Sequence, residues 1–279
     1  MHRSLSAVSG LCDSVRAHCA AIAATARDVA INEVDFDPGH VSGLDPALHF
    51  LEGSPDDVAR YVLILDTINF GSGWFAALGT GTNALTERLT ALTRARGVPW
   101  SADELRAIRS HDLAVLGLDP AHELTRLYAE ALNQLGAWLP HELGNSAEAL
   151  AESLAELPFF NDAGFYKRAQ IAANDLHLAG VVSYPDIDRL TIFADNLVPH
   201  VLRHAGVLTY SDALAERVDN GIELPAGSRA EQEIRGCALH ACEGIARNLQ
   251  VAPALLDNWL WNTGLGLPGR PHITRTTFY

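Results

Sequence analysis

The sequence predicts an all-α fold, and three observations support this prediction. Apolar residues recur three and four positions apart in most segments, as they do along one face of a helix. Several of these segments begin with a capping residue followed by acidic residues, and several end at glycine. The 279 residues, 48% of them hydrophobic, are enough for one large core. We therefore expect residues 1–279 to form a single globular domain of many helices.

The first predicted helix spans residues 5–27, and an irregular segment follows from 31 to 53. This segment is rich in Asp, Pro and Gly and is longer than most loops. Such segments often act as lids or binding loops. His49 lies here between Leu48 and Phe50. It could contact a ligand, or it could be a hydrogen-bonded histidine at the edge of the core.

The next helix has a strong start signal at Ser54-Pro55 and continues through Asn69. A flexible Gly-Ser-Gly turn ends it, so Asn69, Phe70 and Trp74 should gather at this helix end. Such a cluster could hold a flat ligand. The alternative is an aromatic core with an amide at the helix terminus.

Several helices that follow carry little chemistry and are expected to form scaffold. We predict a helix over 82–96 that stops at Gly97, and a capping box at Ser101 starts another. Further helices are predicted from 120 to 138 and from 147 to 157.

A basic pair, Lys167 and Arg168, lies near the start of a helix predicted to run from about 165 to Leu178. A phosphate placed there could meet both side chains and the positive end of the helix dipole. The alternative is a pair of solvated surface charges.

The segment 190–208 has the features of a site. Apolar residues lead into Asp195, and Pro199 favours a helix whose first turn contains it, ending at Gly206. Asp195 therefore falls at or next to the N-cap, where backbone N–H groups stabilise a carboxylate by roughly 0.5–2 kcal/mol. An ionised carboxylate could stabilise a cationic transition state or attack a carbon. Asp195 could also be only a cap.

The C-terminal third is predicted to contain helices over 210–218, 230–249 and 254–261. In the last of these, Asp257 and Trp261 are one turn apart and share a face. A carboxylate beside an indole suits a purine-like base, because the acid accepts hydrogen bonds while the ring stacks. An indole beside a solvated acid is the alternative.

Composition limits the classes of partner. A formal charge of −14 opposes direct binding of nucleic acid, which depends on many phosphate contacts, although it does not oppose a nucleotide. No run of apolar residues is long enough to cross a membrane, and the first residues lack a secretory pattern. We expect a soluble cytoplasmic protein, monomeric in solution.

No cofactor or metal is expected. Cys237, His240 and Cys242 are close in sequence, but on a helix Cys242 points about 160° away from His240. Buried thiols acting as small apolar groups explain these cysteines better. Neither a nucleotide-binding glycine motif nor a Ser-His-Asp signature is present.

Four segments, taken together, resemble the queuosine salvage proteins, a family of queuosine 5′-phosphate N-glycosylase/hydrolases. They are 65–75, 166–171, 193–199, and the C-terminal pair 233–235 with 256–261. The resemblance spans roughly residue 45 to the C-terminus. It implies an all-helical fold similar to helix-hairpin-helix DNA glycosylases. It also implies hydrolysis of queuosine 5′-monophosphate to queuine and ribose 5-phosphate.

The resemblance also assigns roles to residues. The family's catalytic aspartate, in a Phe-Ala-Asp motif, falls on Asp195, and Phe193 matches a phenylalanine that contacts the base. Asp257 and Trp261 match the C-terminal acid and indole. His49 lies in a segment similar to the family's His-Phe-x-x-Gly, although this chain has Leu where many members have a second His.

Three further residues are candidates for substrate contacts: Lys167 for the phosphate, and Asn69 and Phe70 within the first matching segment. N-glycoside cleavage passes through an oxocarbenium-like sugar, so a fixed carboxylate is the main catalytic need. Two other functions stay open, a base-excision glycosylase acting on nucleic acid and a non-catalytic protein that binds a modified base.

Overall fold

The computed structural model describes residues 10–41, 43–139 and 141–279. Within these residues the chain forms twelve α-helices, two short 3₁₀ helices and one two-stranded sheet. The elements in chain order are α1 Leu11–Thr25, β1 Val29–Ile31, α2 Pro55–Thr67, α3 Ser72–Leu78, α4 Thr82–Arg96, α5 Ala102–Ala107, η1 Ser110–Leu116, α6 Glu123–Trp138, α7 Ala147–Ala155, α8 Lys167–Leu178, η2 Ile187–Arg189, α9 Leu197–His204, β2 Leu208–Tyr210, α10 Asp212–Asp219, α11 Arg229–Leu249 and α12 Pro253–Gly264. The prediction of an all-α fold is confirmed, apart from this small sheet.

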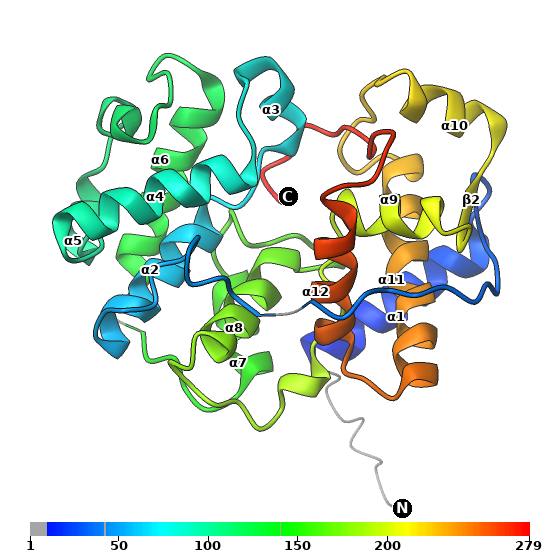
Figure 1. Cartoon of the computed structure of the whole chain (residues 1–279), viewed down its shortest axis with the longest axis horizontal. Helices are drawn as coiled ribbons and strands as arrows, with labels where there is room; N and C mark the ends of the chain where they lie inside the picture. Colours follow the sequence, from blue (N-terminus) through cyan, green and yellow to red (C-terminus); the bar gives the residue numbers. More distant parts are fainter. Residues whose placement is uncertain (1–9, 42, 140) are drawn as a thin grey trace, which may run out of the picture.

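Two groups of helices lie on either side of α8 and α12. Helices α4, α5 and α6 are at the left in Figure 1, and α9, α10 and α11 are at the right. Helix α8 packs on α2 and α7, whereas α12 packs on α9 and α11. The long helix α11 packs on α1. Buried side chains from all these helices form one continuous core.

The sheet was not predicted from the sequence. Strand β1 pairs antiparallel with β2, so that Val29 lies opposite Tyr210 and Ile31 opposite Leu208. Three residues per strand give too little alternation to reveal a sheet. Because Tyr210 belongs to β2, the helix predicted to begin there begins at Asp212.

The helix predicted over residues 5–27 covers Leu11–Thr25, and residues 5–9 lie outside the described residues. Two further helix starts differ from prediction. The helix expected from residue 120 begins at Glu123, where the His122 ring accepts a hydrogen bond from a backbone N–H and forms the cap. The helix expected from residue 165 begins at Lys167, because Tyr166 has a left-handed backbone with φ of 49°. Such a backbone is uncommon for a residue other than glycine and breaks the helical path.

A buried arginine, Arg235 of α11, joins three separate segments (2% exposed). Its Nε donates to the carbonyl oxygen of Ala194 at 2.9 Å. Its Nη1 lies 3.2 Å from Asp162 Oδ1 and 3.1 Å from Glu231 Oε1. The guanidinium also lies over the Phe165 ring, 3.9 Å from its centre. Glu231 lies one turn before Arg235 on the same helix, so the two side chains can pair. The two carboxylates neutralise the guanidinium, so none of these buried charges lacks a partner.

A second buried arginine, Arg168 of α8, donates to backbone oxygens through both terminal nitrogens of its guanidinium. Its guanidinium donates to the carbonyl of Thr67 at 2.6 Å, to that of Thr277 at 2.6 Å and to that of Phe159. It lies 4.6 Å from the centre of the Phe70 ring. Arg168 therefore ties α8 to the end of α2 and to the C-terminal segment.

The C-terminal segment crosses the molecule and ends beside α3, as Figure 1 shows in red. The backbone N–H of Gly71 donates to the Tyr279 carbonyl at 3.0 Å. The Tyr279 hydroxyl donates to Glu231 at 3.0 Å, and its ring stacks on the Arg235 guanidinium. A Cβ at Gly73 would lie 2.3 Å from the Thr274 carbonyl oxygen, so glycine is required where this segment passes α3.

No single helix in the described ranges is long and apolar enough to cross a membrane. Helices α2 and α3 meet such a criterion only when taken together, and they are bent by 82° relative to each other.

Replacing Arg235 by Ala should lower the free energy of unfolding by about 3–5 kcal/mol. The change would leave the Asp162 and Glu231 carboxylates buried without their cation. Urea denaturation followed by circular dichroism measures this. Arg203→Ala is the control, because it removes a pair with Asp219 at the surface and should cost under about 1 kcal/mol. Equal losses in the two variants would contradict the structural role given to Arg235.

Candidate functional site

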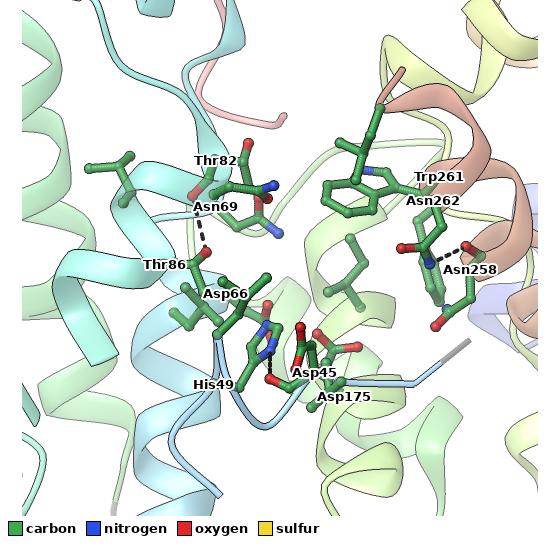
Figure 2. A pocket seen from close by; sticks show the side chains of 18 of the residues that line it. Asp45, His49, Asp66, Asn69, Thr82, Thr86, Asp175, Asn258, Trp261 and Asn262 are labelled. Carbon is green, nitrogen blue, oxygen red and sulfur yellow. Dashed lines mark hydrogen bonds between the residues drawn. The ribbon is translucent and has the colours of Figure 1, made fainter. Parts of the chain in front are cut away.

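A cavity of about 530 Å³ lies between α2, α4, α8 and α12. The predicted irregular segment closes one side of it, through Leu44 to Pro46, Leu48 and His49. A second cavity of about 320 Å³ shares Asn69, Thr82, Lys167, Asp195 and Trp261 with the first. The two cavities therefore meet around Lys167 and Asp195. In Figure 2, Asn69, Thr82 and Trp261 lie in the upper part of the pocket, and Asp45, His49, Asp66 and Asp175 lie in the lower part.

Asp195 is buried at the start of α9 and caps this helix as predicted. Its Oδ1 accepts hydrogen bonds from the backbone N–H of Leu197 at 2.8 Å and of Val198 at 3.1 Å. Its backbone neighbour Ala194 is held by Arg235. Oδ2 lies 3.9 Å from Lys167 Nζ. Asp195 thus combines the role of a cap with a position on the cavity wall, so the two interpretations of the sequence are not exclusive.

Lys167 is buried and lines both cavities (5% exposed). Burial lowers the pKa of its ammonium, and Asp195 opposes this effect. The expectation that a phosphate would also meet Arg168 and the start of α8 is wrong. Arg168 is buried against carbonyl oxygens, and Asp162 Oδ2 already lies 3.5 Å from the backbone nitrogen of Lys167. The alternative of two solvated charges is wrong as well, because both side chains are buried.

Asp257 and Trp261 of α12 both line the larger cavity, on one face of the helix as predicted. Asp257 Oδ1 accepts a hydrogen bond from the Phe193 N–H at 2.8 Å, which leaves Oδ2 for other partners. Burial and the nearby Asp195 raise the pKa of Asp257 well above its usual range. A neutral carboxylic acid both donates and accepts hydrogen bonds, so the raised pKa favours a donor at Asp257 as well as the acceptors expected from the sequence.

Phe193 and Asn69 line the larger cavity, but Phe70 does not. Phe70 borders only the smaller cavity and packs at 4.8 Å, edge to face, on Tyr128. Its other side faces the Arg168 guanidinium. Phe70 therefore belongs mainly to the scaffold, which is the alternative that the sequence left open. Trp74 is likewise buried and donates to Glu123 at 3.3 Å.

His49 is half-buried on the cavity wall, and its Nδ1 lies 2.9 Å from the Asp45 carbonyl oxygen. This contact fixes the ring and leaves Nε2 for another partner. The four cysteines are buried free thiols. In the described part of the chain, no cluster of His, Cys, Asp and Glu has the arrangement of a metal site.

Three carboxyl groups of the cavity, Asp45, Asp66 and Asp175, were missed in the sequence. Asp66 is on the last turn of α2, and Asp175 follows Lys167 and Ile171 at two successive helical turns of α8. The spacing of Lys167, Ile171 and Asp175 places them on one face and was the available signal for Asp175. No such local signal exists for Asp66, because its neighbours come from α8.

Comparison with known proteins identifies the family of this chain. The family model described as queuosine salvage protein matches residues 122–279. The chain belongs to the queuosine salvage protein family. Within that match lie the pocket residues Lys167, Phe193, Asp195, Asp257 and Trp261.

Relatives that match most of the chain carry the name queuosine 5′-phosphate N-glycosylase/hydrolase. The protein from Sphaerobacter thermophilus is 32% identical over 274 residues, covering 83% of this chain and 84% of the relative. The protein from Dictyostelium discoideum is 29% identical and covers 79% and 78%. The protein from Bos taurus is 27% identical and covers 84% and 85%. These matches extend the family likeness well beyond the C-terminal half.

Asp175→Asn should stabilise the protein more at pH 7 than at pH 4. Burial raises the pKa of Asp175 from 3.8 to about 6. At a pH between 3.8 and about 6, the Asp175 carboxyl group keeps its proton in the folded state but loses it in the unfolded state. The unfolding free energy of the parent therefore falls as the pH rises. The difference in unfolding free energy, variant minus parent, should rise by roughly 2–3 kcal/mol across this range.

Urea denaturation of parent and variant at several pH values measures this difference. Asp219→Asn is the control, because Arg203 lowers the pKa of Asp219 and the trend should have the opposite sign. A difference for Asp175→Asn that does not change with pH would contradict the raised pKa of this carboxyl group.

Proposed function

We propose that this protein hydrolyses queuosine 5′-monophosphate to queuine and ribose 5-phosphate. The observation that carries this proposal is the Asp195 carboxylate, held at a helix start beside Lys167 in a cavity with Phe193 and Trp261 on its walls. The names of the relatives support the same reaction. The cavity of about 530 Å³ is in the size range of small-molecule sites.

The reaction places positive charge on the sugar as the N-glycosidic bond breaks. Asp195 can oppose that charge without rearrangement, because two backbone N–H groups already fix its Oδ1 and leave Oδ2 directed towards Lys167. Water then supplies the hydroxyl group at C1′, and its proton balances the departing base. A covalent bond from Asp195 to C1′ and a purely electrostatic role both use this placement.

The base would leave from the larger cavity. Queuine is a 7-deazaguanine, so carbon stands where an ordinary purine has the basic N7, and the base must be activated at another atom. The neutral acid form of Asp257, favoured by its raised pKa, can donate a hydrogen bond to the edge of the base. Phe193 and Trp261 supply apolar walls for the ring.

The phosphate would occupy the smaller cavity, which Lys167 shares. That cavity is also lined by Gly81, Thr82 and Asn83 at the start of α4, whose backbone N–H groups have no side-chain cap. Lys167 would then lie between the phosphate and Asp195. This arrangement favours a single nucleotide over a nucleic acid, since one lysine and one helix start neutralise one phosphate.

Asp195→Asn should reduce the release of queuine from queuosine 5′-monophosphate by at least about 100-fold. The asparagine oxygen can still accept the two helix-cap hydrogen bonds, so the stability should change by less than about 1 kcal/mol. Chromatographic quantification of queuine, with a chelator present, measures the activity, and thermal denaturation checks the fold. Equal release by parent and variant would remove Asp195 from the mechanism. The absence of release by the parent would refute the proposed reaction.

Lys167→Met should reduce kcat/KM for queuosine 5′-monophosphate by about 10- to 100-fold, since a hydrogen bond to a charged group is lost. The loss for unphosphorylated queuosine should be smaller, because only the effect through Asp195 remains. Steady-state kinetics with both substrates measures the ratio. An equal loss for both would place the phosphate away from Lys167.

A further inference from the structure

The larger cavity carries more negative than positive groups. Among the described residues, its lining contains the carboxyl groups of Asp45, Asp66, Asp175, Asp195 and Asp257, but Lys167 is the one basic side chain other than histidine. A phosphorylated nucleotide alone would not require such a lining. The mechanism above uses Asp195 and Asp257, and it leaves the carboxyl groups at the lower end of the pocket without a role.

Asp66 is a buried acid that lacks a partner. It is 1% exposed, and neither carboxyl oxygen has a hydrogen-bond partner in the described ranges. Burial, and then the nearby Asp175, raise the pKa of Asp66 well above its usual range, and the Asn69 side chain opposes this only in part. Leaving both oxygens of a buried carboxyl group without a donor is costly, and such a group usually has a ligand or a partner.

The backbone holds this acid in place. Arg168 donates to the carbonyl oxygens of Asp66 at 3.3 Å and of Thr67 at 2.6 Å. Asp175, on α8 opposite, accepts a hydrogen bond from the Asn174 side chain at 3.1 Å through Oδ1. Both residues line the larger cavity, and Asp175 is near enough to raise the pKa of Asp66. Helices α2 and α8 therefore place a pair of carboxyl groups at the cavity wall, with the Asp66 oxygens covered.

The distance along α8 fits the length of the substrate. Asp175 follows Lys167 by eight residues, which corresponds to about 12 Å along the helix axis. Lys167 lies at the end of the larger cavity that is next to Asp195 and the smaller cavity. A nucleotide with its sugar at Asp195 and its base beside Ile171 would thus direct a substituent on the base towards Asp175 and Asp66.

We propose that Asp175 and Asp66 bind the secondary ammonium group on the substituent that queuine carries at C7. This proposal rests on the proposed function and specifies how the base is selected. An aliphatic secondary amine is protonated at neutral pH and has two N–H donors. Asp175 supplies a carboxylate and Asp66 a carboxyl oxygen, so each donor finds one acceptor. The cation also balances the negative charge of the Asp175 carboxylate.

The test uses two free bases of nearly equal shape, 7-aminomethyl-7-deazaguanine and 7-hydroxymethyl-7-deazaguanine. The first carries an ammonium group and the second a neutral hydroxyl group. Calorimetry on the intact protein at pH 7.5 gives the ratio of their dissociation constants, without any need for turnover. The parent should bind the aminomethyl base about 10- to 100-fold more tightly, as expected for hydrogen bonds to a charged group.

Three variants locate the effect. Asp175→Asn should bring the ratio to within about 3-fold of one, because it removes the negative charge. Asp66→Asn should keep most of the preference, because the amide oxygen accepts as the neutral acid does. Asp219→Asn is the control, because Asp219 lines neither cavity, and it should leave the ratio unchanged. A change of structure alone would weaken both bases alike and would not alter the ratio.

Each other outcome overturns the proposal. A parent ratio near one would show that the ammonium group adds nothing to binding. A preference that survives Asp175→Asn would place this group away from Asp175. If neither base binds, the cavity is not the site of the base. Cleavage of queuosine 5′-monophosphate, measured in parallel, separates the two hypotheses. If the parent cleaves this nucleotide but shows no preference for the ammonium group, the hydrolase function stands and only the carboxyl pair loses its role.

Discussion

The position of the candidate catalytic carboxylate depends on the buried Arg235 guanidinium. This group bonds the Ala194 carbonyl directly before Asp195, and it neutralises Asp162 near the start of α8. It therefore fixes α8, the segment that carries Asp195, and the C-terminal Tyr279 relative to α11. Burying such ions costs desolvation energy, and an apolar cluster could give equal stability. The network is better understood as a device that sets the geometry of the pocket than as a source of stability.

A second constraint comes from charge within the cavity. Lys167 lies beside Asp195, and burial alone would favour the neutral amine, whereas the neighbouring carboxylate favours the ammonium. Asp66 and Asp257 are driven towards their neutral forms by burial and by neighbouring carboxyl groups. These aspartates thus take different roles. Among the described residues that line the cavity, Asp195 is the acid that caps a helix start and lies beside a cation.

Local features of the site could be read from the sequence, whereas features that depend on packing could not. The cap at Asp195 and the shared face of Asp257 and Trp261 follow from residues within one or two helical turns. The sequence could not show that Phe70 packs on Arg168, or that Asp66 meets Asp175. These contacts require α2 and α8 to lie together, and they join residues about a hundred positions apart in the chain. The β1–β2 pairing also joins distant parts of the chain, and strands of three residues give too little alternation to reveal it.

The acidic end of the pocket gives a physical basis for discrimination between nucleotides. Every nucleoside monophosphate has the phosphate and sugar that Lys167 and Asp195 could hold, and a guanine base offers a similar edge to Asp257. Ordinary nucleotides lack a cation on the base, so their bases would leave Asp66 buried without a donor and Asp175 without a counter-charge. An unpaired buried group penalises the wrong ligand more strongly than an added contact favours the right one. Under the proposed function, the same carboxyl pair that binds queuine would therefore exclude the abundant purine nucleotides.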